Sequence, residues 1–345
     1  MLNIEKNKAL APYTTIKIGS TAEFFAVIKN KAELLEAISW AKKQRQPIWI
    51  LGGGSNVLIS RRIKGLVLKN EIRGLEIKKD GRNYKKSSGY AIAEAKSGES
   101  WTKFVNFTVE NGLYGLENLF LIYGTVGGAP VQNIGAYGVE LKDVFDHLIA
   151  IDLHTGRERI FTAAECRFGY RDSIFKHELK GKYFIYSVAV RLKRRADFKL
   201  AYGSLREKLR EKGINKPSLK DVVNIIQEIR NSKLPNPVAM PNAGSFFKNA
   251  SVSTARFKKL SRQYPGMPNF PAGRGQIKIP AAWLIETAGF KGKKFGPVGM
   301  HDKQALILIN HGDATAKQAL ALMKKVKRGV KKRFGIDLEA EVNII

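Results

Sequence analysis

The feature that most restricts the fold of this chain is a glycine-rich segment at residues 124–138, GTVGGAPVQNIGAYG, which holds five glycines and no charged residue. Glycine adopts backbone conformations that are closed to other residues and lets N–H groups approach a ligand closely. A loop that faced only solvent would be more polar, so small apolar residues beside glycines indicate a surface for a flat, uncharged ring. A tight helix–strand junction would use the same composition, and composition alone leaves both interpretations open.

A second glycine cluster, residues 52–56 (GGGSN), directly follows the short apolar run 47–51. Successive N–H groups in such a turn form a nest that binds anions. No Gly-Lys-Ser/Thr follows, so the segment is not a P-loop, and it lacks the G-x-G-x-x-G spacing of a dinucleotide fold. A tight turn without any ligand explains this cluster equally well.

The rest of the chain mixes strand and helix patterns, and its length suggests two or three packed units. The most natural boundary falls near residues 195–203, which gives domains at 1–200 and 201–345. Ser218 and Asp221 resemble a helix-opening capping pair before VVNIIQEI. Helices are expected at 31–43, 100–111 and 281–288 and after Asp313, and strands at 22–30, 47–51, 65–69, 86–95, 146–153, 182–192, 305–309 and 338–345.

The chain is strongly basic, with a formal net charge of +30. Such a balance raises the possibility of a nucleic-acid-binding module, but no zinc finger or clear RRM motif is present. The densest basic run, 324–333, alternates with apolar residues at helical spacing, so we interpret it as the solvated face of an amphipathic helix. A positive field also attracts small anionic ligands such as diphosphates.

The single cysteine, Cys166, excludes an intramolecular disulfide and suits a reducing cytosol. The five histidines show no metal-binding spacing, so we expect no catalytic metal. The first residues lack the apolar core of a secretory signal, and no stretch approaches the roughly 18 apolar residues of a membrane helix. We therefore expect a cytoplasmic protein.

Residues 242–249, NAGSFFKN, place Ser245 between a glycine and two phenylalanines. No G-x-S-x-G elbow is present, so a hydrolase nucleophile is not expected. A hydroxyl in an apolar wall could deliver a proton, whereas an ordinary, hydrogen-bonded strand serine is the common alternative.

Residues 166–176, CRFGYRDSIFK, set Arg167 and Arg171 among aromatic residues. An arginine held on aromatic surface is suited to clamp a carboxylate through two oxygens. The alternative is a surface ion pair, for instance with Asp172.

Residues 338–343, LEAEVN, carry Glu339 and Glu341, which share one face if the segment is a strand. A carboxylate beside a reacting centre can act as an acid or orient one. Two solvated glutamates are the alternative.

Taken together, the ordered set LGGGSNVLIS, GLENLFLIYGTVGGAPVQNIGAYGVEL, ECRFGYRDSIFKH, KLPNP, NAGSFFKN, QALILIN and LEAEV resembles the UDP-N-acetylenolpyruvoylglucosamine reductase (MurB) family over essentially the whole chain. The resemblance implies an FAD-binding domain of the vanillyl-alcohol-oxidase (PCMH) type, with a core at about 17–195, followed by a C-terminal α+β substrate-binding domain whose last strand returns to the active site. It also implies NADPH as hydride donor and reduction of UDP-N-acetylglucosamine enolpyruvate to UDP-N-acetylmuramate, a precursor of peptidoglycan.

Roles follow from the same resemblance, position by position. Ser245 matches the proton donor, and Arg171 and Glu341 match the pair that stabilises the enolate-like intermediate. By the same matching, FAD would be held by Gly52, Gly53, Gly54, Ser55, Asn56, Gly124, Gly127, Gly128 and Gly135, and substrate by Tyr202, Lys233, Asn249 and Gln304.

Tyr202, within YGSL, resembles the tyrosine loop of one family type, which closes over the substrate diphosphate. The chain departs from the usual family pattern at Tyr123, at 14–16 (TTI) and at Asn343. We expect a monomer that binds a UDP-sugar and NADPH, with no specific nucleic acid and no membrane. Another FAD-dependent oxidoreductase on the same fold is the alternative function.

Overall fold

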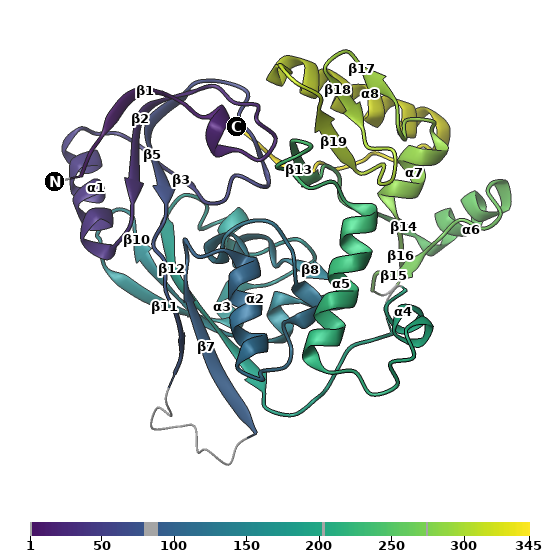
Figure 1. Cartoon of the computed structure of the whole chain (residues 1–345). Helices are drawn as coiled ribbons and strands as arrows, with labels where there is room; N and C mark the ends of the chain where they lie inside the picture. Colours follow the sequence, from purple (N-terminus) through teal and green to yellow (C-terminus); the bar gives the residue numbers. More distant parts are fainter. Residues whose placement is uncertain (1, 79–88, 202–203, 274) are drawn as a thin grey trace. The chain divides into compact units, whose positions relative to one another are not determined.

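The computed structural model describes residues 2–78, 89–201, 204–273 and 275–345 (Figure 1). Backbone contacts divide the chain into two compact units, each described here by itself. The first unit comprises Met1–Lys8, Ala22–Gly53 and Ile63–Ser232, and the second comprises Ala9–Thr21, Gly54–Arg62 and Lys233–Ile345. These units follow contact density, and the domain boundary at residue 200 stays a prediction.

In its described residues the first unit contains two large sheets, besides a two-stranded hairpin. The smaller has the order β1 (Glu5–Ala9), β2 (Thr21–Ile28), β5 (Ile63–Asn70), β3 (Ile48–Leu51), with β5 parallel to both β2 and β3. The larger is antiparallel, with the order β11 (Glu158–Thr162), β10 (Phe145–Asp152), β12 (Tyr183–Lys193), β7 (Tyr90–Lys96), β6 (Leu75–Ile77).

Helix α1 (Lys31–Lys43) connects β2 to β3 and forms where its capping residue and apolar spacing predict. The Asn30 side chain accepts a hydrogen bond from the Glu33 N–H, which satisfies one orphan donor of the first turn. Leu34, Ala37, Ile38 and Ala41 recur at intervals of three and four and pack with residues of β2 and β5.

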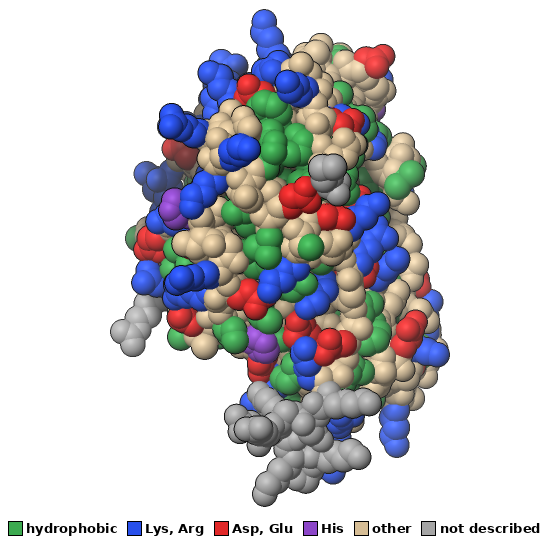
Figure 2. Space-filling view, turned by 90° about the vertical axis from the view of Figure 1, so that its left-hand side faces the viewer, with side chains coloured by type: hydrophobic (Ala, Val, Ile, Leu, Met, Phe, Trp, Pro, Cys, Tyr) green, Lys and Arg blue, Asp and Glu red, His purple; other side chains and the backbone are tan. Residues whose placement is uncertain are grey.

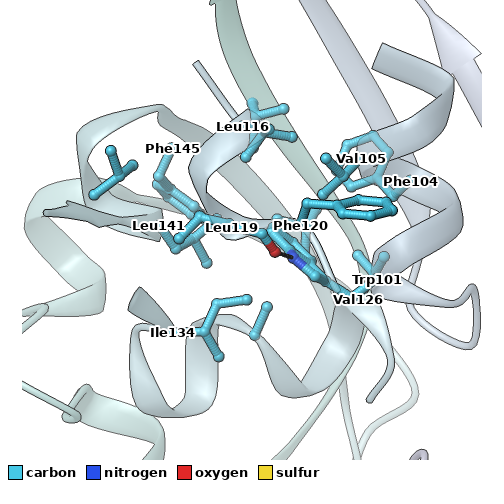
Figure 3. Close-up of a cluster of buried hydrophobic side chains, with 14 of the residues drawn as sticks. Trp101, Phe104, Val105, Leu116, Leu119, Phe120, Val126, Ile134, Leu141 and Phe145 are labelled. Atoms are coloured by element: carbon cyan, nitrogen blue, oxygen red, sulfur yellow. Dashed lines mark hydrogen bonds between the residues drawn. The ribbon is translucent and has the colours of Figure 1, made fainter. Parts of the chain in front are cut away.

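The largest core of the first unit surrounds α2 (Trp101–Glu110), which begins after the capping residue Ser100. Trp101 and Phe104 are fully buried, and Figure 3 shows them beside Leu119 and Val126. The indole N–H of Trp101 donates to the Leu119 carbonyl at 2.9 Å. The segment that leads into the glycine-rich loop is therefore attached to this core.

The first unit also contains further helices, a short hairpin and several 3-10 turns. They are α3 (Ala163–Cys166), α4 (Leu205–Glu211), α5 (Leu219–Lys233), the hairpin β8 (Gly135–Ala136) and β9 (Val139–Glu140), and 3-10 turns at Glu117–Leu119, Val126–Gly128, Pro130–Gln132, Leu141–Asp143 and Ile174–Lys176. Helix α5 extends into Lys233 of the second unit.

The described part of the second unit contains three sheets. The first has the order β13 (Asn242–Ser245), β19 (Ile307–Asn310), β18 (Val298–Met300), β17 (Lys294–Phe295), and the next β14 (Ala250–Ser253), β16 (Gln276–Ile279), β15 (Phe270–Pro271). The third pairs β20 (Asn343–Ile344) with β4 (Val57–Leu58) in parallel. Its helices are α6 (Thr254–Gln263), α7 (Ala281–Thr287) and α8 (Ala316–Phe334), with a 3-10 turn at Ala11–Tyr13.

Most predicted elements are confirmed within a few residues. The capping pair is confirmed as well, since the Asp221 carboxylate accepts from the Ser218 N–H at 2.8 Å and from its hydroxyl at 2.7 Å. The first residues of the strand predicted at 86–95 lie outside the described part, and β7 begins at Tyr90.

The continuous strand predicted over 338–345 is wrong, because only Asn343–Ile344 forms a regular strand. The segment changes its backbone partner midway. The Glu341 N–H donates to the Phe246 carbonyl, whereas the Asn343 N–H donates to the Asn56 carbonyl. A segment shared between two partners forms an isolated bridge at Ala340 and a two-residue strand instead of one ladder.

On the face in Figure 2, lysines and arginines lie dispersed among acidic and apolar residues. On α8 the buried residues are Ala319, Leu322, Met323, Val326, Val330 and Phe334, and the lysines between them are mostly exposed. The interpretation of 324–333 as a solvated helix face is confirmed. Among the described helices, none is both long and apolar enough to cross a bilayer.

Candidate active site

The two glycine clusters, 71 residues apart by the difference between Gly53 and Gly124, pack directly against each other in the first unit. A Cβ added at Gly53 would lie 2.9 Å from the Gly124 Cα, and one added at Gly52 would lie 2.6 Å from Thr125 Oγ1. Real Cβ atoms essentially never come this close. At Gly53 the opposing atoms are backbone, so glycine is required there on steric grounds, whereas at Gly52 the opposing atom belongs to a side chain. Neither cluster is a turn that any small residue could form.

The second glycine segment is held along one side by the loop after β7. The Val126 N–H donates to the Glu99 carbonyl and the Gly127 N–H to the Ser97 carbonyl, both at 2.9 Å. A Cβ at Gly127 would meet the Ser97 Cβ at 2.7 Å, whereas one at Gly128 would meet no protein atom within 4 Å. The backbone is thus fixed from behind and open at Gly128, as a surface for a planar group requires.

The segment after α3 clamps the far end of this glycine loop. Asn133, which is fully buried, donates through Nδ2 to the Gly169 carbonyl at 2.8 Å, and the Ser173 hydroxyl donates to the Val131 carbonyl at 2.7 Å. The Arg171 guanidinium donates through Nη2 to the Gly135 carbonyl at 2.9 Å. Arg171 is therefore fixed against the loop itself.

Arg171 and Arg167 occupy similar left-handed conformations, with φ of 53° and 46°, but their guanidinium groups have different surroundings. Arg167 forms an exposed ion pair with Glu178 at 2.9 Å. Asp172, the partner considered for the arginines, instead contacts His177 at 2.8 Å. The surface-pair alternative thus holds for Arg167, whereas Arg171 bonds the glycine loop and its role as a carboxylate clamp stays a prediction.

A second guanidinium, Arg230 of α5, lies near Arg171 and was missed in the sequence analysis. Burial lowers the pKa of Arg230, and the Arg171 charge lowers it further, while a hydrogen bond to Tyr137 opposes the shift. Burial also raises the pKa of Tyr123. The signal was present in the sequence, since Arg230 follows Val223 and Ile226 at the apolar spacing of α5.

Ser245 ends β13 in the second unit, and a bulge before it sets its orientation. Gly244 has φ of 69°, and its N–H donates to the Asn242 side chain at 2.9 Å. The pairing register with β19 shifts between Asn242 and Ser245, as expected when a glycine occupies the left-handed position of a bulge. Among the described residues, none hydrogen-bonds the Ser245 hydroxyl.

Glu341 lies beside the Ser245 segment through the backbone. Its N–H donates to the Phe246 carbonyl at 3.0 Å, and its carbonyl accepts from Asn56 Nδ2 at 3.4 Å. Glu339, by contrast, is exposed and pairs with Lys248 at 2.5 Å. The second unit therefore brings Ser245, Glu341 and Asn56 into one hydrogen-bonded neighbourhood, while Glu339 is a solvated glutamate.

Thr15 links the first glycine cluster to the serine strand. Its hydroxyl is 2.7 Å from the Asn242 carbonyl and 3.3 Å from the Gly54 carbonyl, and its N–H donates to Gly54 at 3.0 Å. A Cβ at Gly54 would lie 2.1 Å from the Tyr13 carbonyl oxygen. The threonine pair at residues 14–16, noted as a departure in sequence, thus has a structural role.

Comparison with known proteins identifies the family. Residues 22–164 match an FAD binding domain, and residues 236–345 match the UDP-N-acetylenolpyruvoylglucosamine reductase C-terminal domain. The UDP-N-acetylenolpyruvoylglucosamine reductase of Pseudomonas aeruginosa is 44% identical over 343 residues, covering 99% of both chains, and that of Flavobacterium johnsoniae is 42% identical over 100% of both. This chain belongs to the UDP-N-acetylenolpyruvoylglucosamine reductase family.

A solved relative agrees in fold. The reductase (MurB) of Thermus caldophilus is 23% identical, with a TM-score of 0.66 over 100% of this chain and 99% of that one. The predicted combination of an FAD-binding domain with a C-terminal α+β domain is confirmed. The packed glycine segments at 52–53 and 124–128 form a glycine cradle. This cradle fits FAD, because fixed backbone with no side chain suits a diphosphate and a flat ring.

The residues matched to substrate contacts in this reductase family have different local roles. Asn249 accepts the Ala281 N–H at 3.0 Å and so caps α7, and Gln304 accepts the Leu306 N–H at 3.4 Å through its side-chain oxygen. Lys233 is exposed at the end of α5. Tyr202 lies outside the described residues. Arg171 belongs to the first unit and Ser245 and Glu341 to the second, so the assignment of the three to one centre stays a prediction.

We expect Gly53→Ala and Gly128→Ala to separate the two requirements of the glycine cradle, which are close backbone packing and FAD binding. At Gly53 the added methyl meets the Gly124 backbone, so thermal stability of the apoprotein and FAD retention should both fall. At Gly128 it meets no protein atom, so the melting temperature should stay within about 1 °C while FAD binding weakens by about tenfold or more.

Differential scanning fluorimetry of apoprotein and flavin titration by fluorescence quenching measure the two effects. Full FAD affinity in Gly128→Ala would show that this stretch of backbone does not face the cofactor.

Proposed function

We propose that this chain catalyses the NADPH-dependent reduction of UDP-N-acetylglucosamine enolpyruvate to UDP-N-acetylmuramate in the synthesis of peptidoglycan precursors. The observation that carries the proposal is the steric packing of the two glycine clusters, with Arg171 fixed to the Gly135 carbonyl of the same loop. FAD, held on this cradle, supplies hydride transfer. The full-length relatives with this named activity support the choice of substrate.

Arg171 is the group that stabilises the negative charge that develops during the reaction. Hydride addition to the terminal alkene carbon shifts negative charge towards the carboxylate side of the substrate. A guanidinium held in advance by a backbone carbonyl needs no reorganisation as this charge grows, which is the efficient form of electrostatic stabilisation. Arg230, buried and hydrogen-bonded to Tyr137, adds a second positive charge near Arg171.

Ser245 is proposed to give its proton to the carbon next to the one that receives the hydride. Its hydroxyl has no acceptor among the described residues and follows a glycine bulge that sets its direction. Glu341 is proposed to act with Arg171 on the enolate-like intermediate. A serine is a poor acid, so a neighbour must offset the loss of its proton. Lys248 is already paired with Glu339, which favours Lys233 for that task.

The alternative, another FAD-dependent oxidoreductase on this fold, keeps the glycine cradle but does not need Ser245, Arg171 and Glu341 together. A two-step anaerobic titration separates the two. NADPH should bleach the yellow holoenzyme, and UDP-N-acetylglucosamine enolpyruvate should restore the colour with one equivalent per flavin. Bleaching without recovery contradicts the proposed substrate and favours the alternative.

We further propose that the protein works as a monomer in the cytoplasm, with the UDP-sugar and NADPH as its ligands. Tyr202 is proposed to close over the substrate diphosphate, as in the family type with the tyrosine loop. The charge of +30 supports attraction of these anionic ligands without requiring nucleic acid.

Ser245→Ala should leave flavin reduction by NADPH unchanged and slow flavin reoxidation by the enolpyruvyl substrate about 10²–10⁴-fold, because one proton donor is lost. Ser251→Ala, on the exposed β14 strand of the same unit, is the matched control and should change neither step. Stopped-flow absorbance of each half-reaction is the measurement, and equal slowing of both steps would count against the assigned role.

Arg171→Lys should slow reoxidation by about 10²–10³-fold, since an ammonium cannot reproduce the planar fork that reaches Gly135 and a carboxylate together. Arg167→Lys is a close control, because it lies in the same segment with a similar backbone but pairs with Glu178 at the surface. Its rates should stay within about twofold. Similar losses in both variants would place the effect in the fold of the segment.

A further inference from the structure

We propose that His301 is a positioning residue, which holds the turn carrying Gln304 so that the Gln304 side chain presents its NH₂ group beside Ser245. The inference deepens the proposed function and rests on it for the role of Gln304. Its structural part, that an imidazole nitrogen anchors the turn, stands on the second unit alone.

His301 lies buried at the end of β18, with about 6% of its surface exposed. Its backbone N–H donates to the Ile307 carbonyl at 2.9 Å. Its ring nitrogen Nδ1 accepts from the Gln304 N–H at 3.1 Å. A nitrogen that accepts carries no proton, so the neutral ring has its proton on Nε2, which lies 3.2 Å from the Asp302 carboxylate.

Two further bonds complete the turn and settle the orientation of the Gln304 amide. The Ile307 N–H donates to the Gln304 carbonyl at 3.1 Å, and the Leu306 N–H donates to the Gln304 side-chain oxygen at 3.4 Å. Since a backbone N–H requires an acceptor, the amide oxygen faces Leu306. The NH₂ end is therefore the one available to a ligand.

The turn adjoins the Ser245 strand directly. Ile307 is the register partner of Ser245, and the Phe246 N–H donates to the Leu306 carbonyl at 2.8 Å. A displacement of residues 301–307 would therefore move the support of Ser245 and the Gln304 side chain together. Through this turn the buried His301 imidazole, which takes no part in the chemistry itself, affects the position of Ser245.

The surroundings favour the neutral form of this ring. Burial lowers the pKa of His301 below its ordinary value, Lys303 acts in the same direction, and Asp302 opposes them. Strand β19 is uncharged over Ile307–Asn310.

Segment 290–293, which packs against His301 through Gly292, carries two lysines. Of these, Lys291 is paired with Glu286, and the Lys293 ammonium lies towards Gly289.

The direction of the pH effect follows from this shift. With the folded pKa below the ordinary 6.5, the folded state favours the neutral ring, so the anchor is complete above pH 6.5. It is lost as pH falls through the folded pKa, because a protonated Nδ1 can no longer accept the Gln304 N–H. The reaction should therefore show an acid limb below pH 6.5.

His301→Leu and His301→Asn test the anchor, because both remove the imidazole but only asparagine supplies an acceptor for the N–H three residues ahead. In His301→Leu we expect the KM for the enolpyruvyl substrate to rise about 3- to 10-fold, the span of one hydrogen bond, while flavin reduction by NADPH is unchanged. His301→Asn should restore KM to within about twofold and abolish the acid limb, since an amide does not titrate.

A double-mutant cycle with Gln304→Ala shows whether His301 acts through that side chain. If it does, His301→Leu adds little to Gln304→Ala. Fully additive effects, or an Asn variant as impaired as the Leu variant, overturn the positioning role.

Hydrogen exchange of the Gln304 amide is a readout independent of turnover. It should accelerate at pH 7 in His301→Leu and stay protected in His301→Asn. If the wild-type protein fails to turn over the UDP-sugar, the proposed function falls, yet this exchange pattern still decides the structural anchor. Unchanged exchange in His301→Leu overturns it.

Discussion

The structure depends first on a contact between two stretches of bare backbone. At Gly53 and Gly124 two segments of the backbone approach so closely that a methyl group added at Gly53 would collide with the Gly124 Cα. Such an approach leaves a stretch of backbone without side chains, which suits a flat cofactor ring. It also costs conformational entropy, which the fully buried core around Trp101 and Phe104 helps to offset.

The chemical groups of the first unit are fixed by this backbone rather than by one another. Arg171 donates to the Gly135 carbonyl, and Asn133 and Ser173 fasten the same loop to the segment that carries the arginine. Arg230 adds a buried charge whose pKa is lowered by desolvation. Two neighbouring positive charges are suited to a substrate that brings a carboxylate or phosphate.

In the second unit, hydrogen bonds between short backbone segments hold neighbouring parts of the chain together. Thr15 bonds both Gly54 and Asn242, and Glu341 bonds Phe246 while Asn56 bonds Glu341. These links explain why the segment after Leu338 is not a regular strand, since it serves two partners in turn. The His301 turn supports the same neighbourhood from the side of β19.

The sequence by itself determined most of the elements and the family, and it supplied the candidate site residues, whose roles stay predictions. Helical spacing placed α1 at Lys31–Lys43, the Ser218–Asp221 pair placed the start of α5, and the ordered motifs indicated the family. These signals are local, because capping and periodicity act within one or two turns. Only the tertiary structure decided that Gly53 requires Gly124, that Arg171 and not Arg167 faces the loop, that Arg230 lies near Arg171, and that His301 accepts the Gln304 N–H. Steric exclusion and desolvation arise between residues far apart in the chain, so no local pattern encodes them.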